Sequence, residues 1–142
     1  MYDFFKVWAK MDLSLDEFEN FYFKYVDFIQ QVNRTNQDKE YLISKSHEIL
    51  DAFSSNEIFN ILCNDIYNTY IQHPTKQNAK NLFKDTTIRY VLSAYKLFYV
   101  GCSRARKNLT VLIDEDKISE YESEFIKKIK NTGFVVLNKN DI

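Results

Sequence analysis

The stretch Lys96-Leu-Phe-Tyr-Val-Gly-Cys-Ser-Arg-Ala-Arg-Lys-Asn-Leu-Thr-Val-Leu-Ile113 decides the predicted fold class, because the spacing of apolar residues changes within it. From Ile88 onward, apolar residues recur every three or four positions, which predicts an amphipathic helix. We expect Gly101 to end that helix, since glycine is the usual residue just past a helix end. The run 108–113 is rich in β-formers and predicts a strand.

The residues that follow predict a further helix and a second strand. Apolar residues at helical spacing run from Ile118 to Ile129, with three acidic residues before them and Gly133 after them. The run 134–137 again favours a strand. We therefore expect residues 88–142 to form a helix and a βαβ unit with parallel strands and a right-handed crossover. Two parallel strands are fewer than a normal parallel sheet contains, so the sheet would be incomplete.

Upstream, residues 1–87 predict helices only. Ser14 and Glu17 form a capping-box pattern before an aromatic-rich helical stripe. A second helix is expected over 38–53 and a third from the capping pattern at 54–57 to Pro74. The predicted fold class is thus α/β and mostly helical, with a helical module at 1–87 and the βαβ-containing part at 88–142.

Composition excludes several classes of protein. The chain has 142 residues, of which 45 % are hydrophobic and 27 % charged, so it is long enough and apolar enough for one folded domain. Its net charge of −1 excludes a globally basic nucleic-acid binder. Cys63 and Cys102 are too few for a disulfide scaffold, and no apolar run is long enough for a membrane span. We expect a cytoplasmic protein that does not bind membranes.

From residue chemistry alone, the cations Arg104, Arg106 and Lys107 would lie in the turn between the helix and the strand. Exposed cations in such a position are stabilised by the negative end of the helix dipole, and this alone would explain their presence.

This stretch nevertheless closely resembles motif VI of the UvrD-like superfamily 1 DNA helicases. The family's pattern is a helix ending in Leu-Tyr-Val-Ala/Gly-x-Thr/Ser-Arg-Ala, then basic residues and an apolar strand. Here it reads Leu97-Phe-Tyr-Val-Gly-Cys-Ser-Arg-Ala105, followed by Arg106-Lys-Asn-Leu-Thr-Val-Leu112. The resemblance covers residues 97–112, and it implies that the βαβ ending belongs to the second RecA-like domain of such a motor.

The resemblance implies a role for several residues. Arg104 would be the arginine finger that meets the γ-phosphate of ATP bound between two RecA-like domains. Ser103 would orient the turn or contact a phosphate oxygen, and Gly101 would allow the sharp turn. For Arg106 and Lys107, contact with nucleic-acid phosphates and plain solvation are both open. ATP and Mg²⁺ are implied for the complete motor.

Other parts of the family's pattern are missing. The chain has no Gly-x-x-x-x-Gly-Lys-Ser/Thr loop to hold phosphates, nor the family's Asp-Glu pair for magnesium. We therefore expect no cofactor for the isolated chain and no catalysis by it alone. It is either the C-terminal fragment of a longer helicase or a small protein that retains part of one.

The alternative function is a non-catalytic helical module that binds another protein through its aromatic face (Phe18, Phe21, Tyr22, Tyr25 and Phe28). The same face could instead be helical core or stack on bases. As partners we expect the remainder of the motor, DNA through that motor, and a second copy of the chain through exposed strand edges.

Remaining candidates point to structural roles. Asp114, Glu115 and Asp116 stand where acids complement a helix dipole, although they could also ligate magnesium. His47 and His73 lack metal-ligand spacing, so no metal site is predicted. The thiol of Cys102 would be inert unless the neighbouring cations lower its pKa.

Overall fold

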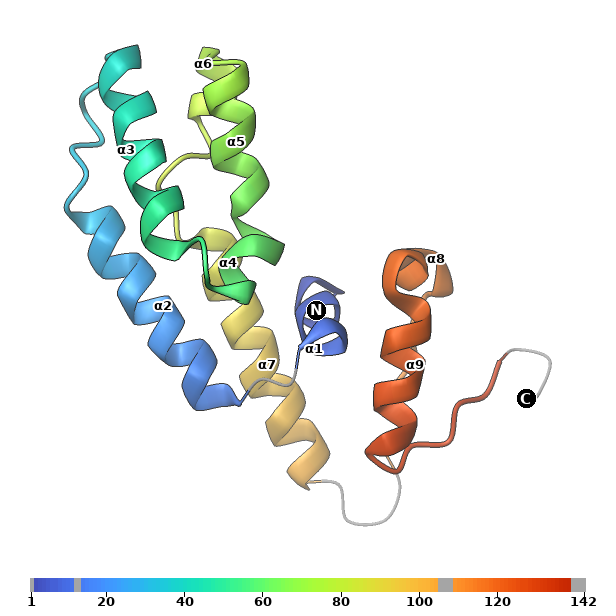
Figure 1. Cartoon of the computed structure of the whole chain (residues 1–142). Coiled ribbons are helices and arrows are strands. Elements are labelled where there is room, and N and C mark those ends of the chain that lie inside the picture. The colour runs from blue at the N-terminus through green and yellow to red at the C-terminus, as the bar shows by residue number, and fades with distance from the viewer. Residues whose placement is uncertain (1, 12–13, 105–108, 139–142) are drawn as a thin grey trace.

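The computed structural model of the chain describes residues 2–11, 14–104 and 109–138, and for Arg104 it describes the backbone only. Helices account for all the regular structure in these ranges (Figure 1). The elements are α1 (Tyr2–Lys10), α2 (Leu15–Gln30), α3 (Lys39–Phe53), α4 (Glu57–Leu62), α5 (Asn64–Gln72), α6 (Lys76–Ala79), α7 (Thr86–Arg104), α8 (Glu115–Ile118), the 3₁₀ helix η1 (Ser119–Tyr121) and α9 (Glu122–Asn131).

The predicted α/β fold class is wrong for the described part of the chain. Residues 109–113 and 134–138 form neither a strand nor a helix, so the expected βαβ unit and its parallel sheet do not form there. The β-forming composition of these runs is real, but a strand exists only where another strand offers its backbone groups. The two runs lie without such pairing on either side of α8 and α9.

The helix predicted after Ser14 is confirmed as α2. The Ser14 hydroxyl accepts a hydrogen bond from the Glu17 amide at 3.1 Å, as expected for an N-cap. Phe18, Phe21 and Tyr25 are buried on its inner face, so the aromatic stripe is helical core. The helix expected over 38–53 is confirmed as α3, with Asp38 as its N-cap.

Between Phe53 and Pro74 the chain forms two helices where one was predicted. Asn56, and not Ser54, caps α4, since its side-chain oxygen accepts from the Phe59 amide at 3.1 Å. The backbone leaves helical geometry at Cys63, which has φ −125° and lies between α4 and α5. Cys63 is 3 % exposed, so the break is within the core.

The N-terminal helix α1 was not predicted, yet it connects the two ends of the molecule. Its side chains Phe4 and Phe5 are buried. The ring of Phe4 lies 5.0 Å from that of Tyr95 in α7, and the ring of Phe5 lies 5.0 Å from that of Phe125 in α9. In Figure 1, α1 accordingly lies between α7 and α9. One hydrophobic cluster therefore includes residues from both 1–87 and 88–142.

The C-terminal helices begin and end as their sequence indicates. The Asp114 carboxylate caps α8 by accepting from the Asp116 amide at 3.1 Å. Gly133 follows α9 with φ +100°, a backbone conformation that favours glycine. Its amide donates to the Lys130 carbonyl at 3.0 Å, which closes the helix end. In the part of the chain that the structure describes, none of the helices has the length and apolarity needed to cross a membrane.

Candidate functional site

Helix α7 carries the residues that match motif VI, and its first half is firmly held. Ile88, Val91 and Leu92 are buried against the rest of the helical core. Two polar contacts join α7 to α2: Tyr22 donates to the Asp85 carboxylate at 2.9 Å, just before α7 begins, and Lys96 pairs with Glu19 at 3.0 Å. The helix is therefore a fixed support for what its C-terminal end presents.

The last turns of α7 are exposed where the first turns are buried. Leu97, Tyr99 and Val100 are exposed by 66 %, 61 % and 39 %. Phe98 and Cys102, on the opposite side of the helix, remain half-buried. The apolar residues of the motif thus point largely away from this chain's own core.

Gly101 does not end the helix, contrary to the sequence-based expectation. It lies inside α7, which continues to Arg104. A Cβ atom at this position would meet nothing within 4 Å, so neither a left-handed turn nor a close approach requires glycine here. The prediction failed because it treated glycine as a stop, while the backbone hydrogen bonds of the helix continue past it.

Ser103 lies one residue before the end of α7 and is exposed. Its hydroxyl donates to the Tyr99 carbonyl, four residues earlier, at 2.7 Å. This is a common contact of serine inside a helix. The side chain of Ser103 is exposed, but its hydroxyl proton is engaged within the helix.

Arg104 is the final residue of α7, so its backbone position at the exposed end of a fixed helix is defined. Arg106 and Lys107 lie outside the described residues, and so does the predicted turn around them. The structure thus brings Gly101, Ser103 and Arg104 onto one helix end. How these three residues lie relative to Arg106 and Lys107 is outside what the structure describes.

A groove of about 150 Å³, lined mainly by apolar residues, lies beside α9. Its walls are the two runs that were predicted as strands, through Val111, Ile113 and residues 134–137, and its floor includes Phe125 and Ile129. Leu112 and Val135 are the most exposed apolar residues of these runs, at 86 % and 82 %. This part of the surface is therefore suited to contact with another polypeptide.

The remaining candidates have structural explanations. Burial raises the pKa of the Cys102 thiol, and burial raises that of Cys63 to about 12, so neither thiol is activated. His47 and His73 are exposed. Among the described residues, no cluster of three or more His, Cys, Asp or Glu side chains could hold a metal ion. The acidic group at 114–116 serves as a helix cap through Asp114.

Sequence reasoning missed one group of residues that the fold gathers. Arg34, Lys76, Lys80 and Lys84 come from two separated segments and line a single pocket. No short motif marks them, since the two segments meet only through the packing of α2, α3 and α5. Comparison with known protein families, with curated proteins and with solved structures found no match.

Proposed function

We propose that this chain acts as the C-terminal part of a UvrD-like ATP-dependent DNA helicase and supplies Arg104 to the γ-phosphate of ATP. The observation that carries the proposal is the motif VI pattern at 97–105, with Arg104 on the exposed end of a fixed helix. ATP and Mg²⁺ would be held by the remainder of the motor, which contributes the phosphate-binding loop. The isolated chain would be inactive.

The chemistry of arginine suits this role. A guanidinium group is planar and always charged, so it can make two parallel hydrogen bonds to phosphoryl oxygens. Charge spreads over these oxygens during phosphoryl transfer, and an arginine at that point stabilises it. Because α7 is anchored through Ile88, Val91 and Leu92, it would move as a rigid body and carry Arg104 into the ATP site.

The exposed apolar side chains favour the proposal that the chain binds a large partner. Of the ten large hydrophobic side chains that are exposed in the described residues, eight lie between Leu97 and Leu137. They therefore concentrate around the motif and the groove beside α9. Exposed apolar side chains in such numbers are typical of an interface. The remainder of a helicase motor is the partner that the motif VI pattern predicts.

The partner predictions change in one respect. Self-association was expected through strand edges, and the described residues contain no strand to provide them. Binding to the rest of the motor, and to DNA through that motor, stays proposed, with Arg106 and Lys107 as candidate contacts to nucleic-acid phosphates. We expect the assembly to work in the cytoplasm, since both cysteines are free.

The non-catalytic interaction module is the second candidate. Its predicted docking face is unavailable, because Phe18, Phe21 and Tyr25 are 0 %, 3 % and 2 % exposed. An interaction module would have to use the surface between Leu97 and Leu137 instead. Those exposed residues fit either function, so a measurement of ATP turnover has to distinguish the two.

The test begins with the open reading frame that contains this chain. We expect it, or a co-expressed neighbour, to encode a phosphate-binding loop. In the ATPase assembled from that product, Arg104→Ala should lower turnover by about 10³-fold or more, and Arg104→Lys should rescue little. Arg89→Ala, which removes an exposed arginine from the same helix, is the matched control and should retain turnover.

Melting temperatures and DNA affinity complete the test. Both Arg104 variants should keep the parental melting temperature and nucleotide-free DNA binding, whereas Arg106→Ala with Lys107→Ala should weaken DNA binding alone. Normal turnover in Arg104→Ala would remove the proposed role of this arginine. A reading frame without a phosphate-binding loop, in a chain that binds no ATPase, would favour the interaction module.

A further inference from the structure

A second site lies away from the motif, near α6. A pocket of about 280 Å³ opens between the α2–α3 loop and the segment from α6 to the start of α7. Four of its lining residues are cations: Arg34, Lys76, Lys80 and Lys84. In Figure 1, α6 lies at the opposite end of the molecule from the C-terminal end of α7, so this pocket is separate from Arg104.

The charged side chains that line the pocket are all cations, and the nearest acidic residues along the chain, Asp38 and Asp85, lie just outside the lining. The lining contains no acidic residue, although the whole chain has a net charge of −1. The ion pairs found in the described residues involve other cations, namely Lys6, Lys45, Arg89 and Lys96. Four like charges around one cavity repel one another, and a bound polyanion would relieve that repulsion.

The floor of the pocket is apolar and closed. Leu42, Leu82 and Phe83 line it, and they are exposed by 6 %, 5 % and 2 %. Phe83 is too deeply buried to offer its ring face to a ligand. Single-stranded nucleic acid is bound largely by stacking on accessible aromatic rings, and this lining provides none. A concave cavity with a cationic rim fits a compact anion better than an extended strand.

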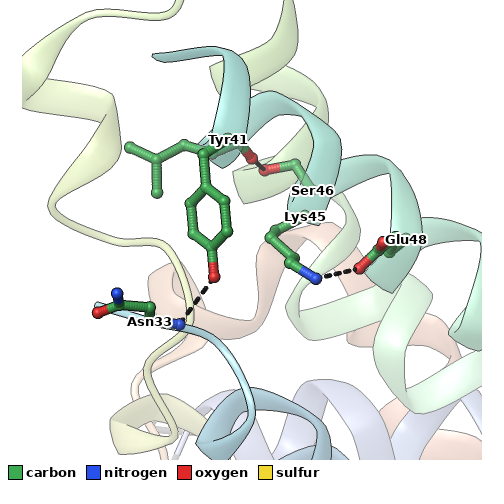
Figure 2. A network of polar contacts seen from close by, with 6 residues as sticks. Asn33, Tyr41, Lys45, Ser46 and Glu48 are labelled. Carbon is green, nitrogen blue, oxygen red and sulfur yellow. Dashed lines mark hydrogen bonds and ion pairs between the residues drawn. The ribbon is translucent and has the colours of Figure 1, made fainter. Parts of the chain in front are cut away.

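The wall that carries Arg34 is held in place by hydrogen bonds. The Asn33 amide donates to the Tyr41 hydroxyl at 2.8 Å, which fastens the loop to α3 (Figure 2). The Asn33 side chain accepts from the Thr35 hydroxyl at 2.7 Å, and the side-chain amide of Gln37 donates to the Arg34 carbonyl at 3.0 Å. Hydrogen bonds within the chain therefore hold the backbone of the loop that carries Arg34, without any ligand.

Tyr41 belongs to α3, and its ring is positioned by neighbouring residues of the same helix. In Figure 2 its ring lies beside Lys45, whose Nζ is 5.7 Å from the ring centroid and 3.0 Å from the Glu48 carboxylate. Ser46 donates to the Leu42 carbonyl at 2.8 Å on the buried side of the same helix. The helix that anchors the loop also supplies Leu42 to the floor.

The wall that carries the lysines is fixed to the core as well. The Phe83 amide donates to the buried Tyr67 hydroxyl at 3.2 Å, and the Tyr25 hydroxyl donates to the Lys84 carbonyl at 3.4 Å. The Asn78 side chain donates to the His73 carbonyl at 2.8 Å. Both walls thus hold their cations at defined backbone positions.

From these observations we propose that the pocket binds the di- or triphosphate group of a small molecule. A triphosphate carries a compact multiple negative charge that four cations around one cavity can match. Arg34 offers a planar fork to two phosphate oxygens, and the lysines act as mobile point charges. The ligand could be a nucleoside triphosphate or inorganic polyphosphate, which present the same group. The proposal does not depend on the helicase function.

Isothermal titration calorimetry on the full chain tests it, without divalent cations and at an ionic strength below about 0.1 M. The probes are tripolyphosphate, ATP, AMP and a thymidine oligonucleotide. We expect saturable binding of tripolyphosphate and ATP, with AMP at least tenfold weaker. Equal affinities for ATP and tripolyphosphate would show that only phosphates are bound, and tighter ATP binding would show that the nucleoside also contacts the pocket.

Variants locate the site. Lys76→Gln with Lys80→Gln should lower the affinity for tripolyphosphate by about tenfold or more, since each removes a charged contact. Lys24→Gln with Lys130→Gln removes the same charge from exposed positions outside the pocket and should change the affinity less than about twofold. All four lysines are exposed, so both double variants should keep the parental melting temperature.

Three results would overturn the proposal: absence of saturable binding, equal losses in the two double variants, or oligonucleotide binding that tripolyphosphate does not displace. The last result would identify a nucleic-acid surface. None of these outcomes bears on ATP turnover by an assembled motor, so this experiment and the Arg104 experiment fail independently.

Discussion

The hydroxyl groups of Tyr25 and Tyr67 lie 2.6 Å apart in the core, where both side chains are buried. Tyr25 in α2 also contacts the Lys84 carbonyl at 3.4 Å, and either hydroxyl can be the donor in its contact with Tyr67 in α5. The Tyr67 oxygen in turn accepts from the Phe83 amide at 3.2 Å. This chain of hydrogen bonds holds the turn before α7, where Phe83 has φ +56°.

Replacing Tyr67 should therefore cost more than replacing Tyr25. Tyr67→Phe leaves the buried Phe83 amide without an acceptor, at an expected loss of about 1–3 kcal/mol in the free energy of unfolding. Both substitutions remove the 2.6 Å contact between the two hydroxyls. Beyond it, Tyr25→Phe removes only the 3.4 Å contact with the Lys84 carbonyl and leaves the Phe83 amide bonded, so its loss should be smaller. Urea denaturation of both variants measures the difference. Equal losses would show that the Phe83 amide does not depend on Tyr67.

The same cluster predicts sensitivity to alkali. Burial raises the pKa of Cys63 to about 12 and raises the pKa values of Tyr25 and Tyr67 above their usual range. These groups stay neutral in the folded chain, while the unfolded chain loses its Cys63 proton from about pH 9 and its tyrosine protons from about pH 10. Stability is therefore complete below these values and falls as pH rises through them, by up to about 1.4 kcal/mol per pH unit for each group.

Unfolding free energies measured from about pH 7 to about pH 11 check this slope. Cys63→Ala should have a smaller slope between about pH 9 and about pH 11 than the parent chain, whatever its stability at neutral pH. Cys102→Ala is the matched control and should change the slope less than Cys63→Ala, because the Cys102 thiol is only half-buried. An unchanged slope in Cys63→Ala would show that this thiol ionises equally in both states.

Lys128 in α9 fastens the C-terminal end of α1. Its ammonium group donates to the carbonyls of Trp8 and Met11 and lies 4.9 Å from the Trp8 ring centroid. Lys128→Met should lower the free energy of unfolding by about 1–3 kcal/mol, because carbonyls at a helix end lose a charged donor. Lys127→Met, at an exposed neighbouring position, should change stability by less than about 0.5 kcal/mol. Chemical denaturation compares them, and equal effects would contradict the capping role.

Helix periodicity was a sound guide wherever a helix buries one face. The stripe Phe18–Tyr25 and the buried residues Ile88–Leu92 follow helical spacing, so α2 and α7 could be predicted. Helix α1 could also have been found, since Phe4, Phe5, Trp8 and Met11 are spaced as one helical face. The break at Cys63 carries no glycine or proline, so only tertiary packing determines it.

The strand predictions failed for a different reason. Leu109–Ile113 and residues 134–137 have the side chains of strands, and β-propensity describes how such side chains fit an existing sheet. The described residues offer no strand for them to pair with, so propensity alone could not decide their structure. The cationic pocket was missed because Arg34 and Lys80 are distant in sequence and become neighbours only in the folded chain.

Alanine substitutions at the two glycines of the chain should change the free energy of unfolding in opposite directions. Gly101 lies inside α7, where an added Cβ meets nothing within 4 Å. Alanine has the higher helix propensity, so Gly101→Ala should raise the free energy of unfolding by about 0.5–1 kcal/mol. Gly133 follows α9 at φ +100°, a conformation strained for any residue with a Cβ. Gly133→Ala should therefore lower it by about 1 kcal/mol.

Urea denaturation of Gly101→Ala, Gly133→Ala and the parent chain measures both effects, and the two substitutions change composition identically. Opposite signs would establish that α7 continues through Gly101 and that α9 ends at Gly133. Destabilisation by Gly101→Ala would instead show that the helix stops at this glycine, as its position in the motif first suggested. Arg104 would then lie outside the helix, and the proposal that α7 carries it into the ATP site as a rigid body would be contradicted.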